Sequence, residues 1–312
     1  MARLVAAMAS SHAYTFYAPE DWDRRYERSR ANYERINGEA PPEHPRCAAE
    51  TLESDRLRFV PVRAALEQLR SEFAAADADA LLILGDDQAE SYPQVIPQFA
   101  VHLGGQVDAY NSESGATSHY ACDSDLSHAL ARMLMEDGFD MAVSRSFPND
   151  RLVTHAHAQI LDFLSPRIPV VLVFINAVCP PAPTPARCYA FGQALARAIG
   201  AAPGPRRVIA YASGGLSHFS SDYPLGEYGG ALRMGAICEE FDSMIAEWIE
   251  AGEGARLASL SSRDLIENGA LEHRQWIALL GMVGERKPEW LVHAAFHRAI
   301  MNMGVAYWRL RA

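Results

Sequence analysis

The sequence has few cysteines, and their spacing does not favour disulfides or structural zinc. Five cysteines are scattered over 312 residues, and no two of them form a CxxC pair. An odd, dispersed set argues against a disulfide framework and predicts a chain that works in a reducing, cytoplasmic compartment. No apolar run approaches the roughly 18 residues that a membrane-spanning helix needs. The apolar stretch near the start is also too brief for a secretory leader, so we expect no membrane segment.

Several common catalytic motifs are absent too. The sequence contains no GxxxxGK[ST], no GxGxxG after a predicted strand, no HExxH and no GxSxG, which removes the main evidence for nucleotide-dependent and α/β-hydrolase chemistry. Positive charge is scarce, because 28 Lys and Arg stand against 39 Asp and Glu, a formal charge of −11. Since phosphate groups are held by clustered basic side chains, we expect no nucleic-acid partner and no anionic membrane partner.

The sequence does contain short apolar runs that alternate with helical patterns. The runs are continuous, which is typical of strands that helices bury on both faces. The predicted strands are Leu4–Met8, Ala80–Leu84, Met141–Ser144, Val170–Ile175 and Arg207–Tyr211. The predicted helices between them are Val62–Ala75, Ser124–Asp137, His157–Leu164 and Pro185–Ile199. This order predicts an α/β fold with a central, mostly parallel sheet flanked by helices.

The last quarter of the chain has a different pattern. The helices predicted there are Ala231–Ala251, Ser262–Gly269, Glu272–Val283 and Trp290–Met303. We therefore predict one domain over residues 1–312, in which residues 231–312 are mainly helical. The polar segment Tyr17–Glu53 is rich in Arg and Glu and interrupted by prolines, and we expect it to cross the sheet edge or to serve as a lid.

Polar side chains follow three of the predicted strands, where each strand ends. His12 follows the first strand, Asp87 and Gln88 follow the second, and His218 follows a Gly-Gly turn after the last. Each residue alone is more often structural than functional. Ligands of open α/β sheets bind at the carboxyl ends of the strands, however, so the joint placement indicates one site.

On these residues the chain resembles the class III extradiol ring-cleavage dioxygenases, which include the protocatechuate 4,5-dioxygenase catalytic β subunit and the 2,3-dihydroxyphenylpropionate dioxygenases. The resemblance runs from residue 10 to residue 276, and SSH and SGGLSH are its most specific parts. The matching stretches are Ser10-Ser11-His12, Gly85-Asp86-Asp87-Gln88, Pro97-Gln98-Phe99, Thr154-His155-Ala156, Val173-Phe174-Ile175-Asn176, Ser213-Gly214-Gly215-Leu216-Ser217-His218 and Leu271-Glu272-His273-Arg274-Gln275-Trp276.

The resemblance implies a non-haem Fe(II) held by two histidines and a carboxylate, with open positions for a catechol and O₂. His12 matches the first histidine and Glu272 the carboxylate, which would otherwise be taken for an exposed residue of a helix. The second histidine is replaced, because relatives carry Asp-His where this chain has Asp87-Gln88. A glutamine carbonyl is a neutral oxygen ligand that preserves the net charge of the site. We therefore prefer Gln88 as the third ligand, with Asp87 as an alternative ligand or a support for the ligands.

The same resemblance implies that His218 is the catalytic base and that His155 is a second active-site histidine, which hydrogen-bonds or protonates the bound oxygen species. We expect the remaining histidines to be structural, with His119 and His273 as the first exceptions to consider. The remaining histidines are His44, His102, His119, His128, His157, His273, His293 and His297.

Two other functions stay open because of Gln88. One is a protein of the same fold that binds or regulates without cleaving a ring. The other is a hydrolase with a divalent metal on His12, Asp87 and Glu272. The expected partners of the dioxygenase are a small catechol and O₂, and the family suggests a homo-oligomer. The sequence leaves the ring substituents open, and also the need for a small partner subunit.

Overall fold

The computed structural model describes residues 1–41, 45–111, 114–147, 152–218 and 237–310, and within them the main feature is an eight-stranded sheet of order β6-β3-β7-β2-β8-β1-β10-β9. The strands are β1 (Arg3–Ser10), β2 (Ala80–Gly85), β3 (Phe99–His102), β6 (Ala142–Ser144), β7 (Val170–Ile175), β8 (Arg207–Ser213), β9 (Trp290–Phe296) and β10 (Met301–Arg309). The central strands β7, β2, β8 and β1 are parallel, and antiparallel pairs flank them. The predicted α/β fold with a mostly parallel sheet is confirmed.

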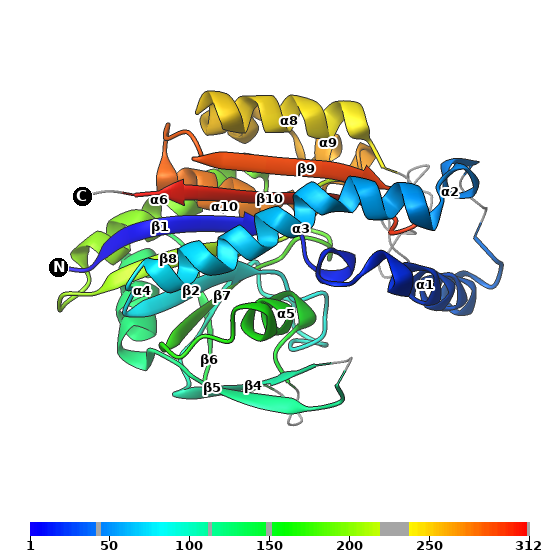
Figure 1. Cartoon of the computed structure of the whole chain (residues 1–312). Helices are drawn as coiled ribbons and strands as arrows, with labels where there is room; N and C mark the ends of the chain where they lie inside the picture. Colours follow the sequence, from blue (N-terminus) through cyan, green and yellow to red (C-terminus); the bar gives the residue numbers. More distant parts are fainter. Residues whose placement is uncertain (42–44, 112–113, 148–151, 219–236, 311–312) are drawn as a thin grey trace.

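Helices cover both faces of this sheet (Figure 1). The helices are α1 (Trp22–Asn37), α2 (Pro45–Ala49), α3 (Leu52–Ala75), α4 (Ser124–Glu136), α5 (His155–Leu164), α6 (Pro185–Ala201), α8 (Glu239–Ala251), α9 (Ser262–Glu267) and α10 (His273–Val283). Side chains of β2 alternate between two cores, since Leu81 packs with α3 and α5 while Leu82 packs with α6 and α10. This double burial explains the continuous apolar runs of the sequence. No helix of the described ranges is both long enough and apolar enough to span a bilayer.

The helices α6 and α10 approach so closely that their backbones touch. A Cβ atom added at Gly192 of α6 would lie 1.8 Å from the carbonyl oxygen of Ala278 in α10. One added at Gly281 of α10 would lie 2.2 Å from the carbonyl oxygen of Tyr189. Glycine is therefore required at both positions for this packing.

The end of the described chain differs from the prediction. The helix predicted over Trp290–Met303 is wrong, because β9 and β10 form an antiparallel hairpin there and β10 pairs with β1. The apolar spacing of this segment fits a helix as well as a strand. Pairing decides the outcome, since without β10 the edge of β1 would keep unsatisfied backbone groups. Among the described residues after β8, the α-helices are α8, α9 and α10, with the 3-10 helix η4 (Gly254–Ser259) between α8 and α9, and residues 231–236 of the first predicted helix lie outside the described residues.

The polar segment Tyr17–Glu53 forms helices rather than an irregular excursion. It contains the short 3-10 helix η2 (Pro19–Asp21) followed by α1 and α2. Figure 1 shows α1 beyond the carboxyl ends of the central strands, next to the loops that carry the predicted site. A second, two-stranded sheet of β4 (Gln106–Tyr110) and β5 (Thr117–Ala121) was not predicted.

Candidate active site

The loops after β1, β2 and β8 meet at the carboxyl edge of the sheet because these strands are parallel neighbours. They bring His12, Gln88 and His218 into one cavity, together with Glu272, which precedes α10. The turn after β8 contacts the Glu272 backbone only because residue 214 is glycine. A Cβ atom at Gly214 would lie 2.3 Å from the Glu272 carbonyl oxygen.

The Glu272 carboxylate is the centre of the site. Nε2 of His12 lies 3.4 Å from Oε2, and Nε2 of His218 lies 3.3 Å from Oε1. The side-chain amide of Gln88 donates to Oε1 at 2.7 Å. Glu272, His12 and His218 are all buried. The structure therefore brings together four of the residues predicted from the sequence.

The hydrogen-bond network assigns the ring protons of both histidines. Nδ1 of His12 lies 3.2 Å from the hydroxyl oxygen of Ser213, and that hydroxyl donates its own proton to the Ala156 carbonyl. His12 must therefore donate from Nδ1, which leaves a lone pair on Nε2. Nδ1 of His218 donates in the same way to the Leu216 carbonyl at 2.7 Å. Both rings present Nε2 to Glu272.

Burial and charge separate the protonation states of these groups. Burial lowers the pKa of His12 to about 4, so this ring is neutral and suited to ligating a metal. Burial would also lower the pKa of His218, but the Glu272 charge and hydrogen bond outweigh it and raise that pKa. Burial would raise the pKa of Glu272, yet the nearby histidines, His218 first through its charge and hydrogen bond, hold it well below its usual range.

His155 begins α5 and is held by a carboxylate that the sequence analysis missed. Its Nδ1 lies 2.8 Å from Oε1 of Glu90, and its backbone N–H donates to Oε2 at 2.7 Å. Burial would lower the pKa of His155, but the Glu90 charge and hydrogen bond raise it to about 10. Its ring packs edge-on against His12, with centroids 4.9 Å apart. His155 is thus a cation beside the neutral His12.

Asp87 and Asp86 have different environments. The two Asp87 oxygens accept from the backbone N–H groups of Ser91 (2.8 Å) and Tyr92 (2.9 Å), so they stabilise the turn after β2. The structure does not bring Asp87 into the described cavity lining with His12 and Glu272. Asp86 is fully buried, and neither of its oxygens has a hydrogen-bond partner in the described residues. Burial, and then the Glu272 charge, raise its pKa. Its position directly after β2 was the signal that could have identified it.

None of the histidines expected to be structural lines this cavity in the described part of the chain. His157 is buried, and its Nε2 lies 3.1 Å from the Val173 carbonyl oxygen. His119 is exposed beside Asp108, and His273 is buried beside Trp276. His44 lies outside the described residues.

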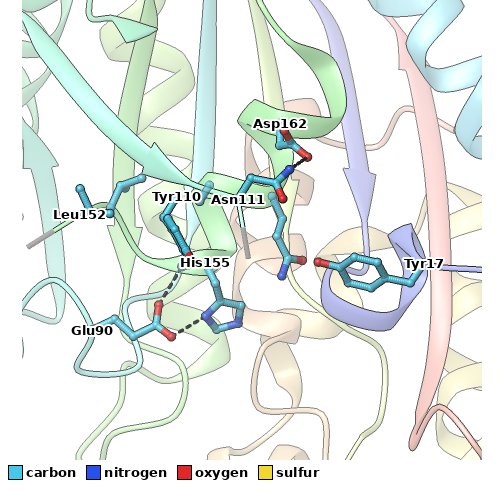
Figure 2. Close-up of a pocket in the computed structure, with 10 residues that line it drawn as sticks. Tyr17, Glu90, Tyr110, Asn111, Leu152, His155 and Asp162 are labelled. Carbon is cyan, nitrogen blue, oxygen red and sulfur yellow. Dashed lines mark hydrogen bonds and ion pairs between the residues drawn. The ribbon is translucent and has the colours of Figure 1, made fainter. Parts of the chain in front are cut away.

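The cavity measures about 300 Å³ and is closed on one side by α1. Arg25, Arg28 and Ser29 of α1 and Tyr14 of the 3-10 helix η1 (Ala13–Phe16) line it together with the residues above. A second pocket of about 390 Å³ shares the wall of Glu90 and His155. Figure 2 shows Glu90 against the His155 ring on one side of this second pocket and Tyr17 on the other.

The donor groups of the site fit a divalent cation. Oε2 of Glu272 is buried without a hydrogen-bond partner among the described residues. Buried carboxylate oxygens of this kind are costly unless a cation meets them. No three His, Cys, Asp or Glu side chains of the described ranges form a ready set of ligands. The Gln88 amide is a further donor group beside Glu272, and it presents its oxygen when it rotates about its last bond.

Known proteins resemble this chain in sequence. A 2,3-dihydroxyphenylpropionate/2,3-dihydroxicinnamic acid 1,2-dioxygenase from Burkholderia vietnamiensis is 31% identical over 198 residues, which is 62% of this chain and 56% of that protein. One of the same name from Rhodococcus sp is 33% identical over 162 residues, which is 50% of this chain and 49% of that protein. The chain thus spans about half the length of the curated relatives it matches.

A crystal structure of an uncharacterized Escherichia coli K12 protein aligns over 97% of this chain and 99% of that chain, with 13% identity and a TM-score of 0.49. The sequence model of the family described as the catalytic LigB subunit of aromatic ring-opening dioxygenase matches residues 41–307. The chain therefore belongs to the LigB family, which confirms the resemblance to the class III extradiol dioxygenases.

Proposed function

We propose that this protein is an extradiol dioxygenase that opens the ring of a catechol with O₂ and depends on non-haem Fe(II). The observation that carries the proposal is the buried Glu272 carboxylate, with His12 on one oxygen and His218 on the other. Membership of the LigB family supports the same function. A cytoplasmic location and a homo-oligomeric state stay predictions from the sequence.

His12, Glu272 and Gln88 are the residues that would hold the iron. The neutral His12 offers the lone pair of Nε2, and Glu272 offers its unpartnered Oε2. Bound iron would supply a Lewis acid for the catechol and the activation of O₂. We assign Asp87 to the support of the ligand loop, because backbone N–H groups occupy both of its oxygens.

His218 is the proposed general base. The Leu216 carbonyl fixes the proton on Nδ1, so Nε2 is the atom that takes a proton from a catechol hydroxyl. The resulting imidazolium is stabilised by Glu272 at 3.3 Å. His155 has the complementary role. Its positive charge, maintained by Glu90, stabilises the negative charge that develops on oxygen and supplies a proton. Both oxygen atoms of O₂ end in the ring-opened product.

The test is anaerobic loading with Fe(II), followed by O₂ consumption with a panel of catechols. We expect one O₂ consumed per catechol and a yellow ring-opened product. A His218→Phe variant should lose turnover by about 10²- to 10⁴-fold while it keeps its iron. Loss of iron in this variant would contradict the division of roles between His218 and His12. Tight catechol binding without O₂ uptake across the panel would instead favour a binding protein.

A further inference from the structure

Two acceptor atoms face each other at the centre of the site. Nε2 of His12, which carries a lone pair, lies 3.4 Å from Oε2 of Glu272, and Oε2 has no hydrogen-bond partner among the described residues. A neutral imidazole beside a carboxylate would ordinarily carry its proton on the facing nitrogen and donate it. Some other group must therefore hold the His12 proton on the far side of the ring.

That group is the Ser213 hydroxyl. Ser213 ends β8 and pairs with Ser10 of β1, two residues before His12, because the two strands are parallel neighbours. Its Oγ lies 3.2 Å from Nδ1 of His12 and donates to the Ala156 carbonyl at 2.5 Å. A carbonyl can only accept, so the hydroxyl proton is committed to Ala156 and a lone pair is left for His12. Ser213 is fully buried, so bulk water does not reach this contact.

The first turns of α5 also hold the backbone beside His12. Ala156 and Gln159 are three positions apart, so they lie on the same face of α5. Oε1 of Gln159 accepts the N–H of Ala13, whose φ of 55° is left-handed and unfavourable for a residue with a Cβ atom. This hydrogen bond offsets part of that cost. The helix thus fixes His12 at two points, the ring through Ser213 and the backbone through Gln159.

We propose that Ser213 and Gln159 are positioning residues that hold His12 ready to bind a metal, Ser213 by fixing the tautomer and Gln159 by fixing the backbone. This inference rests on the proposed function, which assigns His12 as a ligand of Fe(II). A histidine that binds a metal commonly donates its other ring N–H to a carboxylate or a carbonyl, and here a serine hydroxyl takes that place. Without this hydroxyl the proton would move to Nε2 and be donated to Glu272, which would occupy both atoms that a cation needs.

The first test reads the tautomer in the metal-free protein by long-range ¹H–¹⁵N NMR of the histidine rings, with His12→Asn identifying the His12 signals. We expect the Nδ1–H tautomer in the wild type and the Nε2–H tautomer in Ser213→Ala. Ser213→Thr keeps a hydroxyl and should keep the wild-type signals. An Nε2–H tautomer in the wild type, or an unchanged tautomer in Ser213→Ala, would refute the role of Ser213.

The second test is anaerobic Fe(II) titration of the same variants. Ser213→Ala should weaken Fe(II) binding by about 10- to 100-fold, because binding must first move the proton back to Nδ1. Gln159→Met should weaken it by about tenfold or less and leave the tautomer unchanged, since only the acceptor for the Ala13 N–H is lost. Wild-type affinity in Gln159→Met would refute the role of Gln159.

The matched control for Ser213→Ala is Ser10→Ala. It also removes one buried hydroxyl from a central strand, but this hydroxyl pairs with Tyr211 at 2.6 Å. Ser10→Ala should therefore keep the wild-type tautomer of His12 and the wild-type Fe(II) affinity. Equal losses in the two variants would show that any buried cavity near the site disturbs it, and would count against a specific role of Ser213.

The two proposals fail separately. If no catechol is cleaved but Ser213→Ala switches the tautomer and weakens Fe(II) binding, the dioxygenase proposal fails and the positioning of His12 stands. If catechols are cleaved but Ser213→Ala binds Fe(II) as the wild type does, the positioning role is refuted and the dioxygenase proposal stands.

Discussion

Asp87 and Gln88 are neighbours in the sequence, but the turn after β2 sends their side chains to different places. Gln88 and the following Ala89 have φ values of 47° and 58°. This left-handed backbone points the Gln88 amide toward Glu272, while the Asp87 carboxylate accepts the N–H groups of the next turn. Non-glycine residues with such φ values are uncommon and concentrate at functional sites.

The first prediction concerns these two residues. Gln88→Ala should weaken Fe(II) binding at least about tenfold, because a group beside Glu272 is lost. Asp87→Asn should leave Fe(II) affinity near that of the wild type but lower the free energy of unfolding by about 1–3 kcal/mol, since an amide N–H would face a backbone N–H. Anaerobic Fe(II) titration and urea denaturation measure the two effects. The reverse pattern would make Asp87 the ligand.

Asp242 of α8 connects the loop that carries His218 to the strand β10. It is fully buried and accepts from the Ser217 N–H at 2.9 Å and from the Asn302 amide at 2.8 Å. The Ser217 hydroxyl also donates to it. Burial raises the pKa of Asp242 to about 6, which makes its ionisation a cost to the folded state.

The pH dependence of this cost gives the second prediction. A pKa raised in the folded state means that the folded protein binds the proton more tightly than the unfolded chain. The contribution of Asp242 to stability therefore falls as the pH rises from about 4 through about 6. The difference in unfolding free energy between wild type and Asp242→Asn should fall by about 3 kcal/mol at most over this range. Urea denaturation at several pH values measures it, and a pH-independent difference would refute the buried-carboxylate account.

At the scale of elements, the contact of α6 with α10 gives the third prediction. Gly192→Ala should lower the free energy of unfolding by about 1–3 kcal/mol or more, because the added methyl group would collide with the Ala278 carbonyl. Gly200→Ala in the same helix is the control, since nothing lies within 4 Å of the added atom. That change should be neutral or stabilise by up to about 1 kcal/mol. Equal effects of the two changes would show that the close packing is not required.

The sequence predicts elements correctly where burial is complete. It predicts them incorrectly where the spacing of apolar residues fits both a helix and a strand. The strand β7 has the predicted bounds because Val170–Ile175 is buried on every side chain and has no helical spacing. Trp290–Met303 was misread because its apolar residues suit either period, and only pairing with β1 selects the strand. The short strand β3 contains too few residues to carry a signal of its own.

At the scale of the whole molecule, the sequence predicts which loops meet but not which side chains enter the cavity. His12, Gln88 and His218 follow strands, so the topology of a parallel sheet brings them together. Glu90 is not predicted from the sequence because its placement depends on the left-handed turn at Gln88 and Ala89, which contains no glycine to reveal it. The sequence does not predict the α1 arginines either, because a polar helix gives no sign of what it covers.

The fourth prediction concerns the stability of the folded protein with metal. Anaerobic Fe(II) at 100 times its Kd should raise the free energy of unfolding by about 2.7 kcal/mol, and a chelator should reverse the gain. Glu272→Gln should abolish most of this increment, because the negative charge of the buried carboxylate that would meet the cation is lost. Glu267→Gln, on an exposed residue paired with Arg263, should keep it. Thermal denaturation with and without Fe(II) measures this increment in stability. An increment that survives in Glu272→Gln would contradict the assignment of Glu272 as a ligand.

The pairing of β10 with β1 has a consequence for biosynthesis. The Ser11 hydroxyl contacts the Asn302 carbonyl across 291 positions of the chain, and the Gly304 N–H donates to that hydroxyl. A ribosome that adds about 5–20 residues per second needs on the order of tens of seconds to cover this distance. During that time the nascent segment around His12 lacks its partner strand β10. The site around His12 can therefore be completed only after β10 has been synthesised, even where a metal is available earlier.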